Sequence, residues 1–179
     1  MEKFTPLKIQ DTLATGTADG APAGANDLID SGASFTTDGI SEGDIVMDTT
    51  TRVSSIVEAV VDDNNITLKA GATVADTDSY VIYSASSFQT YDISLKDIDL
   101  IEQGTINSIV ITYNTSATSV DTLTITHENV AIGDETIRDT WQETVMKAYE
   151  ASWTNVLIDL ERQQWTQGGQ KKYLSLVLN

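Results

Sequence analysis

The chain has 179 residues, and its 27 Asp and Glu against 10 Lys and Arg give a formal net charge of −17 at pH 7. The carboxylates are spread over both halves, and such a diffuse negative field disfavours binding to nucleic acid or to anionic membrane surfaces. There is no cysteine, so no disulfide stabilises the fold. No stretch approaches the roughly 20 apolar residues that cross a bilayer, and we expect neither a signal peptide nor a membrane span.

The first 26 residues carry little apolar surface. Small residues dominate residues 16–24, GTADGAPAG, so we expect residues 1–26 to form an extended N-terminal arm. Its apolar side chains Phe4, Leu7 and Ile9 are candidates for contacts with a neighbouring subunit. An ordinary solvent-exposed leader is the alternative.

Residues 27–86 read as a small all-β module. Short apolar runs at 43–47, 54–60 and 65–68 are separated by Gly, Asp, Asn and Thr clusters, which is typical of short antiparallel strands joined by turns. A further strand at 79–83 closes the module. The pattern predicts a small β-barrel or sandwich, and the Ser-rich residues 84–87 mark the expected domain boundary.

Residues 87–179 have a different pattern, in which strands surround one helix. Between Asp134 and Trp153 the apolar residues recur at helical spacing, which predicts a helix at about 134–151 with Asp134 as its N-cap and Trp141 on its apolar face. The whole chain is therefore predicted to be mainly β, with an α+β second module in which an antiparallel sheet is covered by one amphipathic helix. The strands expected in this module lie at 91–95, 98–102, 107–114, 120–126, 155–160 and 173–178.

Residues that could carry catalysis or bind a metal are few or unspecific. His127 is the only histidine, and no nucleophile motif accompanies it, so we expect a structural histidine. Acidic pairs such as Asp62–Asp63 and Asp97 with Asp99 are expected in the solvated turns of so acidic a chain. The spacing of Asp76 and Asp78 lacks the glycine and distal glutamate of an EF-hand loop. We predict no catalytic residue, no metal site and no cofactor; calcium binding by Asp-rich loops stays open.

One polar loop is a second candidate for contacts. Trp141 and Trp153 are expected in the core, whereas Trp165 lies in a polar segment next to the only dibasic pair of the chain. This segment could supply complementary charge to an acidic partner, including another copy. A solvated hairpin loop is the alternative. The candidate interface residues in it are Arg162, Trp165, Lys171, Lys172 and Tyr173.

Two stretches resemble known proteins. Residues 28–68, LIDSGASFTTDGISEGDIVMDTTTRVSSIVEAVVDDNNITL, are similar to a small β-module that recurs in structural proteins of tailed bacteriophages, particularly phages of aquatic bacteria. Residues 92–160, from DISLKDIDL to NVLIDL, resemble small virion proteins of the same kind of phage. The shared motifs are compositional, and no catalytic residue is carried over with them.

The resemblance implies a non-enzymatic virion structural protein. A small, acidic, cysteine-free chain of two modules suits a capsid decoration or cement protein that bridges capsomers of the major capsid protein, and it would be assembled into the virion in the host cytoplasm. Because two small modules without disulfides need additional burial, we expect a homo-oligomer. The alternatives are a tail, collar or head-to-tail connector subunit and a receptor- or carbohydrate-binding spike module.

Overall fold

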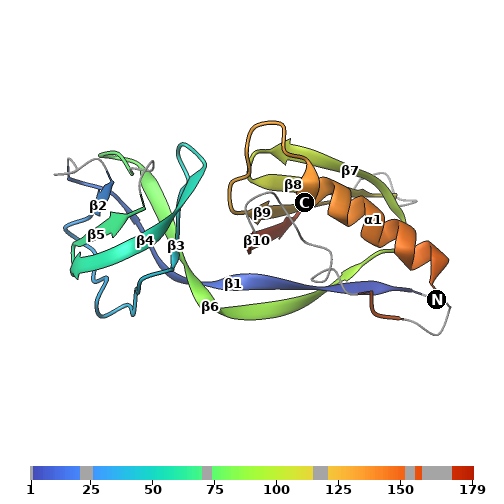
Figure 1. The fold of residues 1–179 in the computed structure, drawn as a ribbon, viewed down its shortest axis with the longest axis horizontal. Helices are drawn as coiled ribbons and strands as arrows, with labels where there is room; N and C mark the ends of the chain where they lie inside the picture. Colours follow the sequence, from blue (N-terminus) through green and yellow to red (C-terminus); the bar gives the residue numbers. More distant parts are fainter. Residues whose placement is uncertain (1, 21–25, 70–73, 115–120, 152–155, 159–170) are drawn as a thin grey trace. The chain divides into compact units, whose positions relative to one another are not determined.

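The computed structural model describes residues 2–20, 26–69, 74–114, 121–151, 156–158 and 171–179, and these form ten strands and one helix (Figure 1). The prediction of a mainly β fold with one helix is confirmed. The strand order is β2-β5-β4-β3-β6-β1-β10-β9-β8-β7. The elements are β1 (Phe4–Thr17), β2 (Asp27–Ile29), β3 (Ile45–Asp48), β4 (Val53–Asp62), β5 (Asn65–Leu68), β6 (Ser79–Ser94), β7 (Ile98–Thr105), β8 (Ser108–Tyr113), β9 (Asp121–His127), α1 (Thr136–Glu150) and β10 (Tyr173–Leu178).

The chain divides into two compact units. Unit 1 comprises Met1–Ile9 and Gln89–Asn179, and unit 2 comprises Gln10–Phe88. The division falls inside strands β1 and β6, so these two strands contribute to both units. The Ser-rich segment at 84–87, where the sequence predicts the boundary between the modules, lies within β6, directly before the division at Phe88. Ser84 is buried and its Oγ accepts hydrogen bonds from the backbone N–H groups of Ser86 and Ser87, which holds the segment in place.

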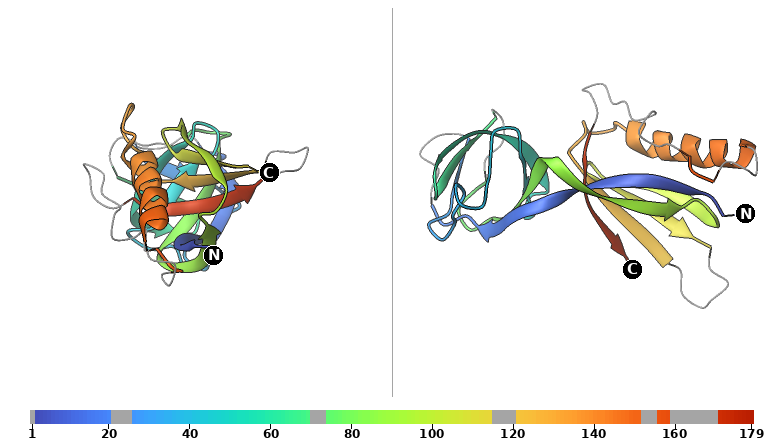
Figure 2. Two further views of the ribbon diagram at one scale, coloured as in Figure 1. Left: turned by 90° about the vertical axis from the view of Figure 1, so that its right-hand side faces the viewer. Right: turned by 90° about the horizontal axis from the view of Figure 1, so that it is seen from below.

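Unit 2 is a small curved sheet that closes on itself, as the ring of strands in Figure 2 shows. Strand β5 pairs antiparallel with β2 and β4, and β3 pairs antiparallel with β4 and β6. The backbone N–H of Asp19, just after β1, donates to the carbonyl of Ile29 at 3.1 Å and joins the first strand to β2. The apolar side chains inside this ring form one core, which includes Leu28, Phe35, Val57, Ile66, Leu68, Tyr80 and Ile82.

A buried polar pair lies in the core of unit 2. The Tyr80 hydroxyl donates a hydrogen bond of 2.7 Å to Asp30 Oδ2, and the Tyr80 ring packs against Phe35 with ring centroids 6.1 Å apart. The other oxygen of Asp30 accepts from the backbone N–H of Gly32 at 2.9 Å. The Asp30 carboxylate is therefore buried with both oxygens hydrogen-bonded, as burial of a charged group requires.

Unit 1 is a sheet covered on one face by α1 (Figure 1). Strand β8 pairs antiparallel with β7 and β9, and β9 pairs antiparallel with β10. On the other side of β10, β1 pairs with it in parallel, with Ile9 opposite Tyr173. Trp141 of α1 is fully buried, and its Nε1–H donates to the Tyr173 hydroxyl at 3.1 Å. The helix thus packs its apolar face on the sheet, and this hydrogen bond joins the two layers in the core.

The helix begins slightly later than the sequence predicts. Glu135 occupies the N-cap position and makes no side-chain capping bond, whereas the Asp134 carboxylate accepts a hydrogen bond of 3.0 Å from the backbone N–H of Thr136. Asp134 therefore serves the start of the helix from one residue further out than a standard N-cap. The negative charges at this end suit the helix dipole.

The segment expected to be an N-terminal arm is, from Phe4 to Thr17, the long strand β1. Alternate residues at its start, Thr5, Leu7 and Ile9, are buried. The low apolar content of residues 1–26 is the reason the sequence predicts an arm. A strand that pairs on both sides needs an apolar residue at only every second position, so this content is enough for β1. Part of the small-residue run, residues 21–25, lies outside the described residues.

Candidate functional site

Three of the predicted contact residues are buried in the structure. Leu7, Ile9 and Tyr173 are buried in the core of unit 1, so their side chains stabilise the fold and have almost no surface for a partner. Phe4 is half-buried, and its backbone pairs with the segment around Leu157. Arg162 and Trp165 lie outside the described residues, as do Trp153 and residues 155, 159 and 160 of the strand expected at 155–160.

The dibasic pair is attached to the end of β9. Lys171 and Lys172 are both half-buried. The backbone N–H of Lys172 donates to a carboxylate oxygen of Glu128 at 2.8 Å, and the backbone N–H of Glu128 donates to the Lys172 carbonyl at 3.0 Å. These two contacts of the Lys172 backbone fix the start of β10 beside β9, so Lys172 has a structural role.

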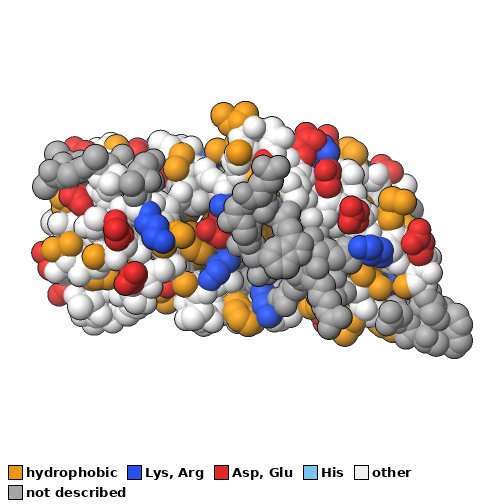
Figure 3. All heavy atoms as spheres, in the orientation of Figure 1, with side chains coloured by type: hydrophobic (Ala, Val, Ile, Leu, Met, Phe, Trp, Pro, Cys, Tyr) orange, Lys and Arg blue, Asp and Glu red, His pale blue; other side chains and the backbone are white. Residues whose placement is uncertain are grey.

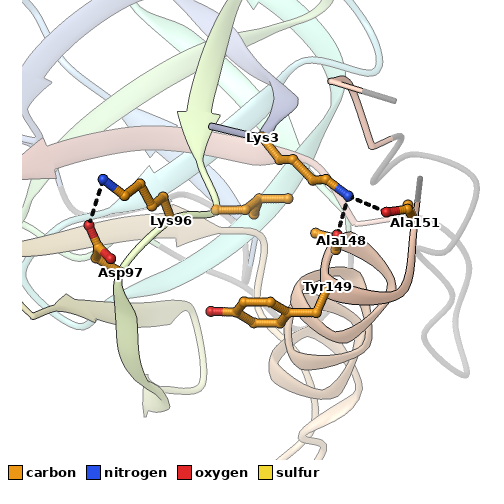
Figure 4. A pocket seen from close by; sticks show the side chains of 7 residues that line it. Lys3, Lys96, Asp97, Ala148, Tyr149 and Ala151 are labelled. Atoms are coloured by element: carbon orange, nitrogen blue, oxygen red, sulfur yellow. Dashed lines mark hydrogen bonds and ion pairs between the residues drawn. The ribbon is translucent and has the colours of Figure 1, made fainter. Parts of the chain in front are cut away.

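A surface hollow of about 330 Å³ lies in unit 1 at the C-terminal end of α1. Figure 4 shows Lys3 reaching the last turn of the helix and Tyr149 beside it. Lys96 and Asp97 neutralise each other at 3.3 Å, and both side chains are mostly exposed. Among the described residues that line the hollow, none forms a pair of nucleophile and base within reach of each other. It is lined by Lys3, Leu95, Lys96, Asp97, Ala148, Tyr149 and Ala151.

Lys3 closes the end of α1. Its ammonium group donates to the carbonyl of Ala148 and, at 2.8 Å, to the carbonyl of Ala151. These carbonyls belong to the last turn, where backbone acceptors have no partner within the helix and where the helix dipole attracts a positive charge. Sequence reasoning missed this residue, because a lysine near the start of the chain carries no sign of which helix end it meets.

We expect Lys3→Met to lower the free energy of unfolding by about 1–2 kcal/mol, because it removes two hydrogen bonds from a charged donor while keeping most of the apolar stem. Chemical denaturation of both proteins measures the difference. Lys96→Met is the matched control, since its ion pair with Asp97 is exposed and contributes little. Equal stability of the Lys3 variant and the wild type would contradict the capping role.

His127 is completely buried at the end of β9. Its Nδ1 lies 2.7 Å from the carbonyl of Glu128, so this nitrogen carries the proton, while Nε2 is buried with no hydrogen-bond partner among the described residues. Burial lowers the pKa of His127, and the hydrogen bond to Glu128 opposes this shift. The imidazole is therefore held neutral in the core, and no carboxylate or hydroxyl is placed as its catalytic partner in the described part of the chain.

The pH dependence of His127 is directly measurable because it is the only histidine. Because the pKa of His127 is lowered in the fold, the unfolded chain takes up a proton below a pH of about 6.5 that the folded chain does not. The contribution of His127 to the free energy of unfolding is therefore present above that pH and is lost as the pH falls below it. We expect the imidazole resonances in an NMR titration to give a midpoint below 6.5. A midpoint above that value would show an exposed or ion-paired histidine instead.

The acidic pairs found in the sequence hold turns. Asp62 and Asp63 accept from the backbone N–H groups of Asn64 at 2.8 Å and Thr36 at 3.2 Å. Between Asp76 and Asp78 the chain makes a tight turn in which Thr77 has a positive φ of 73°. Within the described residues, no group of three or more His, Asp or Glu side chains is placed to hold a metal ion.

The acidic charge is distributed over the surface of both units. Figure 3 shows Asp and Glu side chains scattered across the visible face rather than gathered in one patch, with fewer Lys and Arg between them. In the described part of the chain, no helix has the length and apolar character needed to cross a membrane. A search for similar proteins found no family model and no curated protein that matches the chain.

Proposed function

We propose that this chain is a non-enzymatic structural protein of a virus particle, most simply a capsid decoration protein that bridges neighbouring shell subunits. One observation carries the proposal: in the described part of the chain, the buried aspartates and His127 bond to neighbouring groups of the fold. The buried aspartates accept hydrogen bonds from neighbouring groups, among them Ala85 N–H on Asp44 at 2.8 Å and Thr50 N–H on Asp48 at 2.8 Å. The resemblance of residues 28–68 and 92–160 to structural proteins of tailed phages is the reason for proposing a phage particle as the assembly.

The division of the chain into two cores supports this role. Each unit buries its own apolar cluster, and strands β1 and β6 contribute to both. A protein that bridges two neighbouring subunits needs a contact region for each, and two cored units on one chain supply two such regions. The acidic surface would keep the protein from adhering to packaged DNA.

Immunogold electron microscopy of purified phage particles from the source of this sequence tests the proposal. A decoration protein gives label over the whole shell, and recombinant chain added to stripped shells should raise the temperature at which they break. Label at a single vertex or along a tail would overturn the decoration role in favour of a connector or tail subunit. Absence of label from every particle would overturn the structural role itself.

A further inference from the structure

Strand β6 forms one edge of the sheet in unit 1. Within this unit the strand order is β6-β1-β10-β9-β8-β7, so β6 and β7 are the two edges. The other neighbour of β6 is β3 of unit 2, and its register with β6 covers only Tyr80 to Tyr83. From Gln89 to Ser94, β1 is therefore the only strand beside β6 among the described residues, and Figure 2 shows that part of β6 at the border of unit 1.

The opposite edge is protected against pairing. Helix α1 packs near β7, and the side-chain amide of Gln142 donates to the Ile101 carbonyl at 3.4 Å. Strand β7 also carries the carboxylates of Asp99 and Glu102. Coverage and charge are the usual means by which a sheet edge avoids pairing with another chain.

The β6 edge has neither kind of protection before Asp92. The sequence from Ser79 to Tyr91 contains no charged residue in a chain of net charge −17. All residues from Ser86 to Asp92 are exposed, including Tyr91, whose side chain is 40% exposed. An exposed, uncharged edge strand is a template for another strand.

The edge is also held in a fixed position. Ile93 is buried in the core of unit 1, and the Tyr113 hydroxyl donates to the Ser94 carbonyl at 3.1 Å. The backbone N–H of Leu95 donates to the carbonyl of Lys3 at 2.8 Å. A strand fixed in this way loses little conformational entropy when a partner strand adds to it.

We infer that residues Gln89–Ile93 pair antiparallel with the same residues of a second copy, which makes one sheet continuous across a two-fold axis. Two copies of so acidic a chain repel each other over most of their surface, and this edge offers close approach with a single carboxylate. With Tyr91 opposite its symmetry mate, Asp92 of one copy lies opposite Thr90 of the other, so no two carboxylates face each other. Gln89, which shares a face of the strand with Tyr91, accepts a hydrogen bond from the Tyr91 hydroxyl within its own copy.

Crosslinking tests the pairing, because the natural chain has no cysteine. In Tyr91→Cys the two introduced thiols lie across the axis, within reach of a disulfide, and mild oxidation should give mostly crosslinked dimer at protein concentrations where the control does not. The control is Leu100→Cys, which places a thiol on the protected edge at a residue that is 47% exposed. Equal crosslinking of the two variants, or none in either, would overturn the inference.

A charge exchange at the same position gives a second measurement. Sedimentation velocity should show concentration-dependent dimers of the wild type, and Tyr91→Glu and Tyr91→Lys should each raise the dissociation constant roughly ten-fold or more, because like charges then face each other. An equimolar mixture of the two variants should restore dimers. Unchanged dimerisation of either variant, or no gain on mixing, would contradict the pairing; circular dichroism confirms that each variant is folded.

This inference goes beyond the proposed function and does not rest on it. Dimers joined through β6 without label on any particle would leave the inference standing and reject the structural role. Label over the shell together with a wild type that stays monomeric would support the structural role and reject the pairing through β6.

Discussion

Replacing Trp141 with alanine is expected to destabilise unit 1 by about 3–5 kcal/mol, the cost of removing a large buried aromatic side chain. The Trp141 side chain is completely buried. It packs edge-on to Tyr173, with ring centroids 6.4 Å apart, and holds α1 on the sheet. Urea unfolding followed by far-ultraviolet circular dichroism measures the loss.

Trp141→Phe separates the hydrogen bond from the packing. It keeps an aromatic ring but loses the Nε1–H donor to the Tyr173 hydroxyl, and we expect it to cost about 1–3 kcal/mol, clearly less than the alanine variant. If both variants matched the wild type in stability, α1 would not depend on this residue for its position. Met146→Ala, at a residue of the same helix that is 64% exposed, is the control and should have little effect.

The second large effect is expected in unit 2, from Gly16→Ala in β1. A Cβ at Gly16 would overlap Asp30 Oδ2 and the Tyr80 hydroxyl, and it would lie 2.7 Å from Tyr80 Cζ. Both groups are buried and bonded to each other, so neither moves without breaking their hydrogen bond. We expect a loss of about 2–4 kcal/mol from overpacking and from separation of this pair, measured by urea unfolding.

Two comparisons make this prediction specific. Gly32→Ala should be nearly neutral, because its Cβ would lie 3.4 Å from Asp30 Oδ1, close to an ordinary contact. In a Tyr80→Phe background, the additional cost of Gly16→Ala should fall, since the overlapping hydroxyl is gone and the two substitutions share one site. Full additivity of the two changes would mean that the added methyl group does not meet this pair.

The sequence predicts those elements whose periodicity is local. The strand at 65–68 coincides with β5, and the helix expected at about 134–151 contains α1, because alternation and helical spacing are properties of neighbouring residues. A mainly β chain with one helix follows from these patterns without knowledge of the pairing partners.

The parts that sequence reasoning missed depend on distant residues. Strand β1 is polar and rich in small residues, and it is ordered because it pairs with strands formed much later in the chain. The serines at 84–87 lie next to the division between the units, but the sequence does not show that they continue a strand in which Ser84 is buried and accepts from the N–H of Ser86. Lys3 meets the end of α1 across 148 positions of sequence. No local pattern encodes contacts of this kind.

The sharing of β1 and β6 between the units has a consequence for the order of folding during synthesis. Unit 2 is one continuous stretch, Gln10–Phe88, and can form its core as soon as that stretch leaves the ribosome. Unit 1 needs both Met1–Ile9, which precede unit 2 in the sequence, and β10, which follows it and whose Tyr173 lies opposite Ile9. Residues 4–9 of β1 are therefore made before unit 2 but cannot pair with β10 until the chain has been translated to Tyr173 and beyond.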